Sequence, residues 1–483
     1  MAYEAVIGIE VHAQLLTKSK MFCGCGTDYM GAPPNTHVCP VCLGMPGVLP
    51  VINRKAVEYT IMAGLALNCQ VPEATKWDRK NYHYPDLPKG YQISQYDLPL
   101  TRDGWLEIDH DGERKRIGIR RVHLEEDTAK LFHEEGYALV DFNRSGVPLL
   151  EIVSEPDLRS IEEVRQYVTE LRTILRYLGV SSGDMEKGAM RFEVNISLRA
   201  RGGEEYGTRV EIKNLNSFRA VLNSLKYEIE RQKEILQSGG KIEQETMGWD
   251  EVRGGTVPQR SKEYAHDYRY FPEPDLPPLE LKREWIESIR ARLPELPDAK
   301  RERFIANYGL SDYDAGVVVA DREVAELFEE YAKAHPEKGK LAVNWMSREL
   351  FPLLNEGRVT LEEFRSKWPP EYVWQLLDSY DRGWITRSTA TQVTTMITIG
   401  GDDRPPSRII GEERLAQISD ADQLATVVDQ VLEDNPKAVA DYLGGKEGAL
   451  RYLVGQVMKA TKGKANPSLA NRLLKERLKE KKG

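Results

Sequence analysis

The 483-residue chain lacks any uncharged apolar run of about 18 residues, the length that a helix needs to cross a bilayer. Its first residues, MAYEAVIGIEVHAQL, lack the basic segment and the apolar segment of a secretory signal. Charged residues make up 30% of the chain and hydrophobic residues 41%, which is enough for real cores. We therefore expect a protein of the cytoplasm with no membrane partner.

An excess of positive charge is also missing. The net charge is -9 at pH 7, whereas a general nucleic-acid coat needs clustered Lys and Arg to bind phosphates. Basic residues gather only at the C-terminal end, where residues 457–483 hold nine Lys or Arg and two Glu. Any contact with RNA is therefore expected to be local, and no DNA partner is expected.

The common nucleotide-binding and hydrolase motifs are absent. There is no G-x-x-x-x-G-K-[ST] loop, no G-x-G-x-x-G segment after a strand and no G-x-S-x-G elbow. The piece Lys462-Gly463-Lys464 lacks the rest of a phosphate-binding loop and is interpreted as a turn between helices. These absences disfavour the folds to which the motifs belong.

Cysteines are few, but four of the five fall between residues 23 and 42. They form a C-x-C pair and a C-x-x-C pair separated by thirteen residues, a spacing that suits structural zinc with four thiolate ligands. The predicted ligands are Cys23, Cys25, Cys39 and Cys42. His37 could replace one thiolate, and reduced cysteines in a glycine-rich loop are the alternative. Disulfides are not expected in a reducing compartment.

The chain divides into three parts by pattern. Residues 3 to about 290 mix alternating strands with two helices, near 160–178 and 217–237, and indicate an α+β domain. The prolines of residues 271–278 favour a boundary shortly afterwards. Helical patterns follow to about residue 400, residues 400–413 are interpreted as a linker, and a small helical domain ends the chain. The predicted domains are 1–293, 294–405 and 406–483.

Strand alternation predicts which polar side chains share a face. In residues 3–15 the odd positions are apolar, so Glu10 and His12 lie together on the other face. The same reasoning selects further residues in the segments VHLEED, PLLEIV, MRFEVNISLR and TRVEIKN. These residues are Glu125, Glu151, Arg191, Glu193, Glu211 and Lys213.

If these strands pair in one sheet, its polar face carries several carboxylates, a histidine and basic residues. Carboxylates together with substrate phosphates suit Mg²⁺, and Arg or Lys neutralises a transferring phosphoryl group. The pattern therefore indicates ATP-dependent phosphoryl transfer. The alternative is the solvated face that any half-exposed antiparallel sheet has. The Tyr- and Pro-rich loop 80–100, with Lys80 and Lys89, could hold a nucleotide or a tRNA end, or could be a packed surface loop.

Several longer sequence segments, spread over essentially the whole chain, resemble those of one known family. The sequence resembles the B-subunit family of bacterial and organellar aspartyl/glutamyl-tRNA amidotransferases. The segments are VIGIEVHAQL, CLGMPGVLPVIN, KNYHYPDLPKGYQISQYD, VHLEEDTAKL, DFNRSGVPLLEIVSEPD, EIKNLNSFRAV, AHDYRYFPEPDLPP and LVGQVMKATKGKANP, together with the cysteine pairs. The family commonly has Cys-Asp where this sequence has Phe192-Glu193, which leaves the role of that carboxylate open.

The resemblance implies a fold and a reaction. The fold is an antiparallel cradle domain related to glutamine synthetase and guanido kinases, followed by an all-α domain and a YqeY-like tail. In the reaction ATP phosphorylates the side-chain carboxylate of Glu-tRNA(Gln) or Asp-tRNA(Asn), and ammonia then displaces phosphate. The enzyme is thus a ligase that forms a carbon-nitrogen bond with glutamine as amido donor. The implied partners are an amidase A subunit and a small C subunit, with an ammonia channel between the active sites.

The resemblance also implies site residues. Mg²⁺ is expected at His12, Glu125 and Glu151, with Glu10 and Glu211 close by. We expect His12, Glu125, Glu151 and Glu10 to be catalytic. The candidates for binding ATP phosphates are Lys80, Lys89, Arg191 and Lys213, and those for binding tRNA are Lys459, Lys462 and Lys464.

Two other functions compete with this one. The first is a non-catalytic tRNA-binding scaffold, which would not require four such groups on one sheet face. The second is a free-standing kinase of a small carboxylate, whose helical tail would have no substrate to hold. Which of the two mischarged tRNAs is the substrate depends on the synthetases of the cell.

Overall fold

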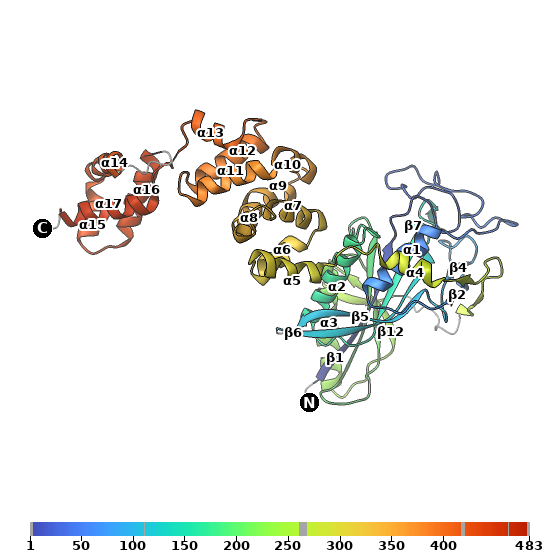
Figure 1. The fold of residues 1–483 in the computed structure, drawn as a ribbon. Coiled ribbons are helices and arrows are strands. Elements are labelled where there is room, and N and C mark those ends of the chain that lie inside the picture. Colours follow the sequence, from blue (N-terminus) through green and yellow to red (C-terminus); the bar gives the residue numbers. More distant parts are fainter. Residues whose placement is uncertain (1–2, 111, 260–267, 417–420, 462, 481–483) are drawn as a thin grey trace. The chain divides into compact units, whose positions relative to one another are not determined.

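The computed structural model describes residues 3–110, 112–259, 268–416, 421–461 and 463–480 (Figure 1). The chain separates into two compact units, Met1–Pro297 and Asp298–Gly483. Among the described residues, no helix is both long enough and apolar enough to pass through a bilayer.

The first unit is built on an eight-stranded sheet in the order β13-β12-β11-β10-β1-β9-β6-β5. Its strands are β1 (Tyr3–Gln14), β5 (Thr101–His110), β6 (Glu113–Glu126), β9 (Pro148–Ser154), β10 (Met190–Ala200), β11 (Val210–Leu215), β12 (Glu245–Asp250) and β13 (Gly255–Pro258). Every neighbouring pair is antiparallel except β11 and β12, which run parallel. The sheet predicted to be antiparallel is therefore mixed, because this one pair is parallel. Helix α3 (Phe218–Gln237) joins the two strands, and a helical crossover returns the chain in the same direction.

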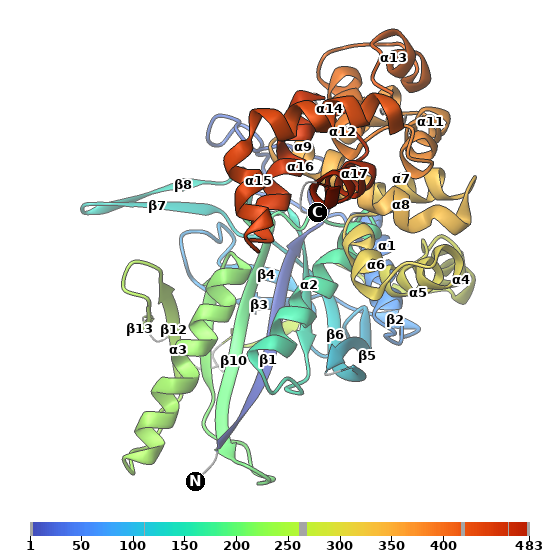
Figure 2. The same cartoon turned by 90° about the vertical axis from the view of Figure 1, so that its left-hand side faces the viewer.

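One face of this sheet is apolar and is covered by helices. Ile7, Ile9 and Val11 of β1 are almost fully buried in a core that includes residues of α1 (Arg54–Ala66), α2 (Ile161–Tyr177) and α3. Helix α4 (Arg283–Arg290) contributes Ile289 to the same core. In Figure 2 strands β1 and β10 run side by side, with α2 and α3 next to them. The polar side chains of these strands are left on the opposite face.

Both helices predicted in this unit are confirmed. Helix α2 spans Ile161–Tyr177, and the side chain of Ser160 accepts a hydrogen bond from the backbone N–H of Glu163 (3.1 Å). The Glu163 carboxylate accepts a further hydrogen bond from the backbone N–H of Arg159 (2.7 Å). Helix α3 begins after its N-cap residue Ser217 and ends at Gln237.

Smaller sheets accompany the large one. A three-stranded sheet has the order β14-β3-β4, β15 pairs with β2, and β7 pairs with β8. Their bounds are β2 (Ala74–Thr75), β3 (Asp78–Asn81), β4 (Tyr91–Ser94), β7 (Lys130–Glu134), β8 (Tyr137–Asp141), β14 (Phe271–Pro272) and β15 (Leu279–Glu280). Ser94 of β4 donates a hydrogen bond to Glu125 of β6 (3.1 Å), so the three-stranded sheet adjoins the polar face. The β7–β8 hairpin projects from the unit (Figure 2).

The second unit is helical throughout its described residues. Its elements are α5 (Pro297–Tyr308), which starts at the last residue of the first unit, α6 (Asp312–Val319), α7 (Arg322–Ala332), η2 (Pro336–Lys338), α8 (Gly339–Trp345), η3 (Met346–Leu350), α9 (Phe351–Asn355), α10 (Leu361–Lys367), α11 (Pro370–Asp381), α12 (Arg387–Thr398), α13 (Pro406–Glu412), α14 (Ala421–Asp434), α15 (Pro436–Leu443), α16 (Gly448–Ala460) and α17 (Pro467–Glu480). Two hydrophobic clusters form, one between Phe304 and Leu415 and the other between Leu424 and Leu478.

The segment predicted as a linker, residues 400–413, is instead partly helical. It contains α13, and Ile409 of this helix is fully buried in the cluster that ends at Leu415. Proline is well placed in the first turn of a helix, where its missing N–H is not needed, so Pro405 and Pro406 start α13 rather than prevent it. The first cluster of this unit therefore continues through the predicted linker.

The helix-covered face provides a test of stability. Leu171 of α2 has no exposed surface and packs in the core under the sheet. We expect Leu171→Ala to lower the free energy of unfolding of the first unit by about 2–5 kcal/mol, because it leaves a cavity as well as losing burial. Urea unfolding measures the effect. Thr169→Ala, on the exposed side of the same helix, should change it by less than about 0.5 kcal/mol. Equal effects of the two substitutions would contradict this packing.

Candidate functional site

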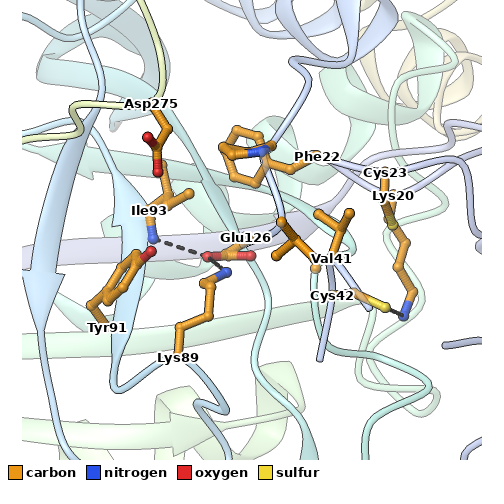
Figure 3. Close-up of a pocket in the computed structure, with 13 residues that line it drawn as sticks. Lys20, Phe22, Cys23, Val41, Cys42, Lys89, Tyr91, Ile93, Glu126 and Asp275 are labelled. Carbon is orange, nitrogen blue, oxygen red and sulfur yellow. Dashed lines mark hydrogen bonds and ion pairs between the residues drawn. The ribbon is translucent and has the colours of Figure 1, made fainter. Parts of the chain in front are cut away.

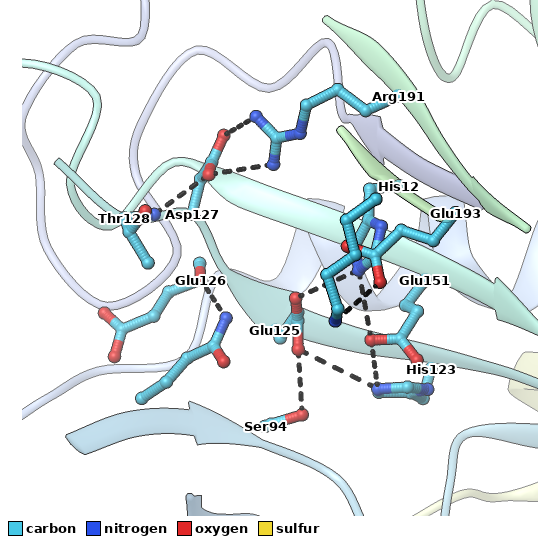
Figure 4. A network of polar contacts seen from close by, with 12 residues as sticks. His12, Ser94, His123, Glu125, Glu126, Asp127, Thr128, Glu151, Arg191 and Glu193 are labelled. Atoms are coloured by element: carbon cyan, nitrogen blue, oxygen red, sulfur yellow. Dashed lines mark hydrogen bonds and ion pairs between the residues drawn. The ribbon is translucent and has the colours of Figure 1, made fainter. Parts of the chain in front are cut away.

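Strand register brings the main polar cluster together. His12 on β1 is paired across the sheet with Glu151 on β9, and Glu151 is paired in turn with His123 on β6. Glu125 follows two residues after His123, so it points to the same face. These side chains converge from three neighbouring strands (Figure 4).

Three of these residues have the geometry of a metal site, and we call them the triad: His12, Glu125 and Glu151. The His12 Nε2 atom lies 3.4 Å from a Glu151 oxygen and 3.9 Å from a Glu125 oxygen. One potential ligand atom from each residue lies within 4.8 Å of the others. Carboxylates favour Mg²⁺, while an imidazole also suits Mn²⁺ or Zn²⁺. The donor set therefore fits a divalent cation.

Burial and mutual charge shift the protonation of the triad. Burial alone would lower the pKa of His12, but its hydrogen bond to Glu151 and the surrounding carboxylates raise it to about 9. Burial, followed by the charge of Glu151, raises the pKa of Glu125 to about 7. Burial opposes ionisation of Glu151, yet His123 and His12 hold its pKa well below the ordinary value. Without a metal, the carboxylates thus depend on neighbouring positive charge.

His123 belongs to this cluster but was not selected from the sequence. Its side chain is 2% exposed, and its Nε2 atom lies 3.4 Å from Glu151 and 3.9 Å from Glu125. Burial lowers its pKa to about 4, so the ring is neutral at pH 7. Its Nδ1 atom is buried without a hydrogen-bond partner among the described residues. The alternation that selected Glu125 also places His123 on the polar face, so this signal was present in the sequence.

A second group of carboxylates lies on the neighbouring strands. Glu10 accepts a hydrogen bond from Asn195 (3.0 Å). Lys213 bridges Glu193 (2.9 Å) and Glu211 (3.0 Å). Among the described residues, the triad has its possible ligand atoms close enough together to hold one metal ion, and Glu10 and Glu211 are not part of that group. The predicted proximity of these two residues to a cation stays a prediction.

The predicted phosphate-binding residues lie in different places. Burial would lower the pKa of Lys80, but Tyr270 and the carboxylates Glu125 and Glu151 raise it, so this cation lies within electrostatic range of the triad. Arg191 is paired with Asp127 (3.1 Å), a buried residue that sequence reasoning did not select. Lys213 and Arg191 therefore already have carboxylate partners, whereas Lys80 is influenced by the carboxylates of the triad.

Lys89 lies in a separate pocket (Figure 3). Its ammonium group is paired with Glu126, which also accepts from the backbone N–H of Ile93 (3.0 Å). Glu126 directly follows Glu125 on β6, and consecutive strand residues point to opposite sides. The pocket encloses about 40 Å³ and is also lined by Tyr91 and Asp275. Its lining includes no residue of the triad.

The four cysteines form the cluster that their spacing predicts. The Sγ atoms of Cys23, Cys25, Cys39 and Cys42 all lie within 4.8 Å of one another. His37 lies beside Asp28 instead, at 3.5 Å, and is not part of this cluster. Four sulfur ligands at such distances fit a tetrahedral structural zinc site.

Lys20 lies next to this cluster and was also missed. Its side chain has no exposed surface, and its ammonium group donates to the Cys42 sulfur (3.6 Å) and to the backbone carbonyl of Phe142 (3.3 Å). A hydrogen bond from Cys23, with further help from the backbone of Cys39 and the charge of Lys20, lowers the pKa of Cys42 to about 4. Lys20 therefore places positive charge against a thiolate inside the fold (Figure 3).

The basic residues predicted to bind tRNA lie in and after α16. Lys459 is exposed in its last turn. Lys464 is half-buried, and its ammonium group donates to the backbone carbonyl of Arg414 (2.7 Å). Lys462 lies outside the described residues.

Comparison with known proteins gives a consistent family. Residues 5–287 match the model of the GatB/GatE catalytic domain, and residues 326–478 match that of the GatB domain. The B subunit of the aspartyl/glutamyl-tRNA(Asn/Gln) amidotransferase of Carboxydothermus hydrogenoformans is 54% identical over 481 residues, 99% of each chain. The protein of the same name from Moorella thermoacetica is 55% identical over 482 residues, 99% of this chain and 100% of that one.

Lys20 gives a test of the cysteine cluster. We expect Lys20→Met to weaken zinc retention by about 10- to 100-fold, the usual effect of losing a group that supports a metal ligand. Competition with a chelator, starting from zinc-loaded protein, measures the change. Lys18→Met removes an exposed lysine two residues away and should leave zinc affinity unchanged. Identical affinities of the Lys20 variant and the wild type would show that the ammonium group does not support the thiolates.

Proposed function

The chain belongs to the family of aspartyl/glutamyl-tRNA(Asn/Gln) amidotransferase B subunits, and on that premise we propose that its triad is the site where ATP activates the aminoacyl-tRNA. As such a subunit, the chain is part of a ligase that forms a carbon-nitrogen bond with glutamine as amido donor. The observation that carries the proposal is the convergence of His12, Glu125 and Glu151, and the charges of the two carboxylates act on Lys80.

The reaction proceeds in two displacements. An oxygen of the side-chain carboxylate of Glu-tRNA(Gln) or Asp-tRNA(Asn) attacks the γ-phosphorus of ATP, and ADP leaves. Ammonia then attacks the acyl carbon, phosphate leaves, and the amide loses a proton. Activation is needed because a carboxylate is a poor acyl donor, whereas its mixed anhydride with phosphate has a good leaving group.

The chain's residues would perform this chemistry by charge and position. Mg²⁺ held by the triad would neutralise charge on the transferring phosphoryl group. The ammonium group of Lys80 stays protonated beside Glu125 and Glu151 and offers positive charge to phosphate oxygens. Ser94 orients Glu125 by donating a hydrogen bond at 3.1 Å, and His123 lies against Glu151 at 3.4 Å.

The pocket with Lys89 and Glu126 suits a path for ammonia. Its volume of about 40 Å³ holds a few molecules of the size of water, which is also the size of ammonia. It lies beside the strand that carries Glu125, since Glu126 is the next residue. Ammonia is released from glutamine by a separate amidase A subunit, which with a small C subunit would complete a heterotrimer.

The remaining parts have supporting roles in this proposal. The first unit is a cradle related to glutamine synthetase and guanido kinases, consistent with a sheet that has helices on one face and a polar site on the other. Zinc at the four cysteines is structural. Exposed Lys459, with Lys462 and Lys464, contacts tRNA, and which mischarged tRNA is bound depends on the synthetases of the cell. A pure scaffold is less well supported, because it gives no role to a buried group of carboxylates and histidines.

The activation step can be tested with one substitution. In the reconstituted heterotrimer, Glu125→Gln should reduce ADP release that depends on Glu-tRNA(Gln) by at least about a hundredfold, the scale of losing a preorganised electrostatic group. Binding of tRNA and hydrolysis of glutamine should persist. Glu113→Gln changes an exposed residue of the same strand and serves as the control. Undiminished ADP release in the Glu125 variant would favour the scaffold.

The ammonia path can be tested by filling the pocket. Val48 lines it, and Val48→Phe should remove most amidation supported by glutamine while amidation supported by added ammonium salt persists. Glutamine hydrolysis should also continue, because the amidase site is separate. Val51→Phe adds the same bulk at an exposed position of the same loop and should change neither activity. If amidation from glutamine and amidation from ammonium salt were lost equally, the pocket would not be the path that carries ammonia from the amidase.

A further inference from the structure

Five tyrosine rings form a continuous row near the triad, and we call it the tyrosine row. Its order is Tyr84, Tyr82, Tyr268, Tyr270 and Tyr96. Neighbouring ring centroids are 5.8, 6.3, 6.1 and 4.3 Å apart along this order. Tyr84 is 43% exposed and Tyr96 is 53% exposed, so both ends of the row present ring surface to solvent.

The row is assembled from distant segments of the chain. Tyr82 and Tyr84 follow β3 and Tyr96 follows β4, whereas Tyr268 and Tyr270 precede β14. The three-stranded sheet β14-β3-β4 brings these segments together. Asn81 also holds the later segment, because its side-chain amide donates to the backbone carbonyls of Tyr268 (3.2 Å) and Arg269 (2.7 Å). The rings are thus placed by the backbone rather than by chance collapse of a loop.

The middle of the row is connected to the triad through Lys80 and its strand, because β3 pairs with β4 and Ser94 of β4 donates a hydrogen bond to Glu125 (3.1 Å). The Lys80 ammonium lies 5.0 Å from the ring centroid of Tyr268. The charges of Glu125 and Glu151 act on the same ammonium. One set of aromatic side chains therefore reaches from solvent-exposed rings to the cation beside the proposed active site.

The charge around the row is compatible with a polyanion. The exposed Asp97, which follows Tyr96, is paired with Lys76 at 2.6 Å. Glu273, close to β14, is fully engaged by Arg79 at 2.6 and 2.8 Å. Basic partners neutralise both of these carboxylates, and the Lys80 ammonium lies over the ring of Tyr268.

We propose that the tyrosine row binds the unpaired nucleotides at the 3′ end of the aminoacyl-tRNA by stacking and so delivers the attached amino acid to the triad. Proteins that bind single strands commonly stack successive bases on aromatic side chains beside a positive groove. Five rings in a row offer more surface than the single adenine of ATP occupies. The inference rests on the proposed function, because it assumes that the esterified amino acid is the substrate.

Equilibrium binding to the reconstituted heterotrimer tests this directly. The probes are an uncharged tRNA(Gln) and the same tRNA without its unpaired 3′ nucleotides. Tyr84→Ala and Tyr96→Ala should each weaken binding of the intact tRNA by about tenfold, the range found when a base loses a stacking partner. Binding of the truncated tRNA should be nearly unaffected. The loss of affinity on truncation should therefore be smaller in the variants than in the wild type.

Two controls separate stacking from folding. Tyr84→Phe and Tyr96→Phe keep the rings and should bind both tRNAs like the wild type. Tyr206→Ala removes an exposed ring of the same unit outside the row and should change neither affinity. Glutaminase activity of the assembled complex verifies that each variant is incorporated.

Two results would overturn the inference. If truncation weakens binding equally in the wild type and in the alanine variants, the row is only a packed surface. If the KM for ATP rises while both tRNA affinities stay unchanged, the row serves the adenine of ATP instead. The binding measurement needs no turnover, so it is independent of the outcome for Glu125→Gln.

Discussion

The pairing register of β1, β9 and β6 is the constraint on which the site depends. His12, Glu151 and His123 stand in one row only because these three strands pair as they do. A shift of one residue in any strand would turn its polar side chains into the apolar core. The core prevents this shift, since Ile9, Val11 and Leu150 are almost fully buried on the opposite face. Burial under the helices thus positions the chemistry on the other side.

Such a site concentrates negative charge where solvation is poor. Glu125 and Glu151 are nearly buried, and an isolated carboxylate there would not remain ionised. His12 and Lys80 supply compensating charge to these two residues, and Lys213 does so for Glu193 and Glu211. In the proposed function, a divalent cation at the triad would add to this compensating charge, and Lys80 would contact phosphate. The proposed binding of a metal ion and a nucleotide would use this same electrostatic arrangement.

The sequence predicted local features better than distant neighbours. The cysteine cluster depends on two short spacings, and alternation selected His12, Glu125 and Glu151 because it concerns one strand at a time. Alternation could not show which strands are adjacent, so the separate surroundings of Lys89 and Arg191 did not follow from it. The tyrosine row joins residues almost two hundred positions apart, which no local pattern reveals. The linker prediction failed because residues 400–413 contain a short helix that begins at Pro406, and its burial against the preceding helices depends on tertiary packing.

Strand β6 links the two halves of the proposed reaction by the alternation of its side chains. Glu125 belongs to the triad, and the next residue, Glu126, lines the pocket that contains Lys89. Pairing of Glu125 with Leu149 and of Glu126 with Pro148 on β9 keeps these two directions fixed. An activated carboxylate at the triad and ammonia in the pocket would then be only the thickness of one strand apart. Water would compete with ammonia at this point, so in the proposed mechanism a small pocket lined by the Lys89–Glu126 pair would limit hydrolysis.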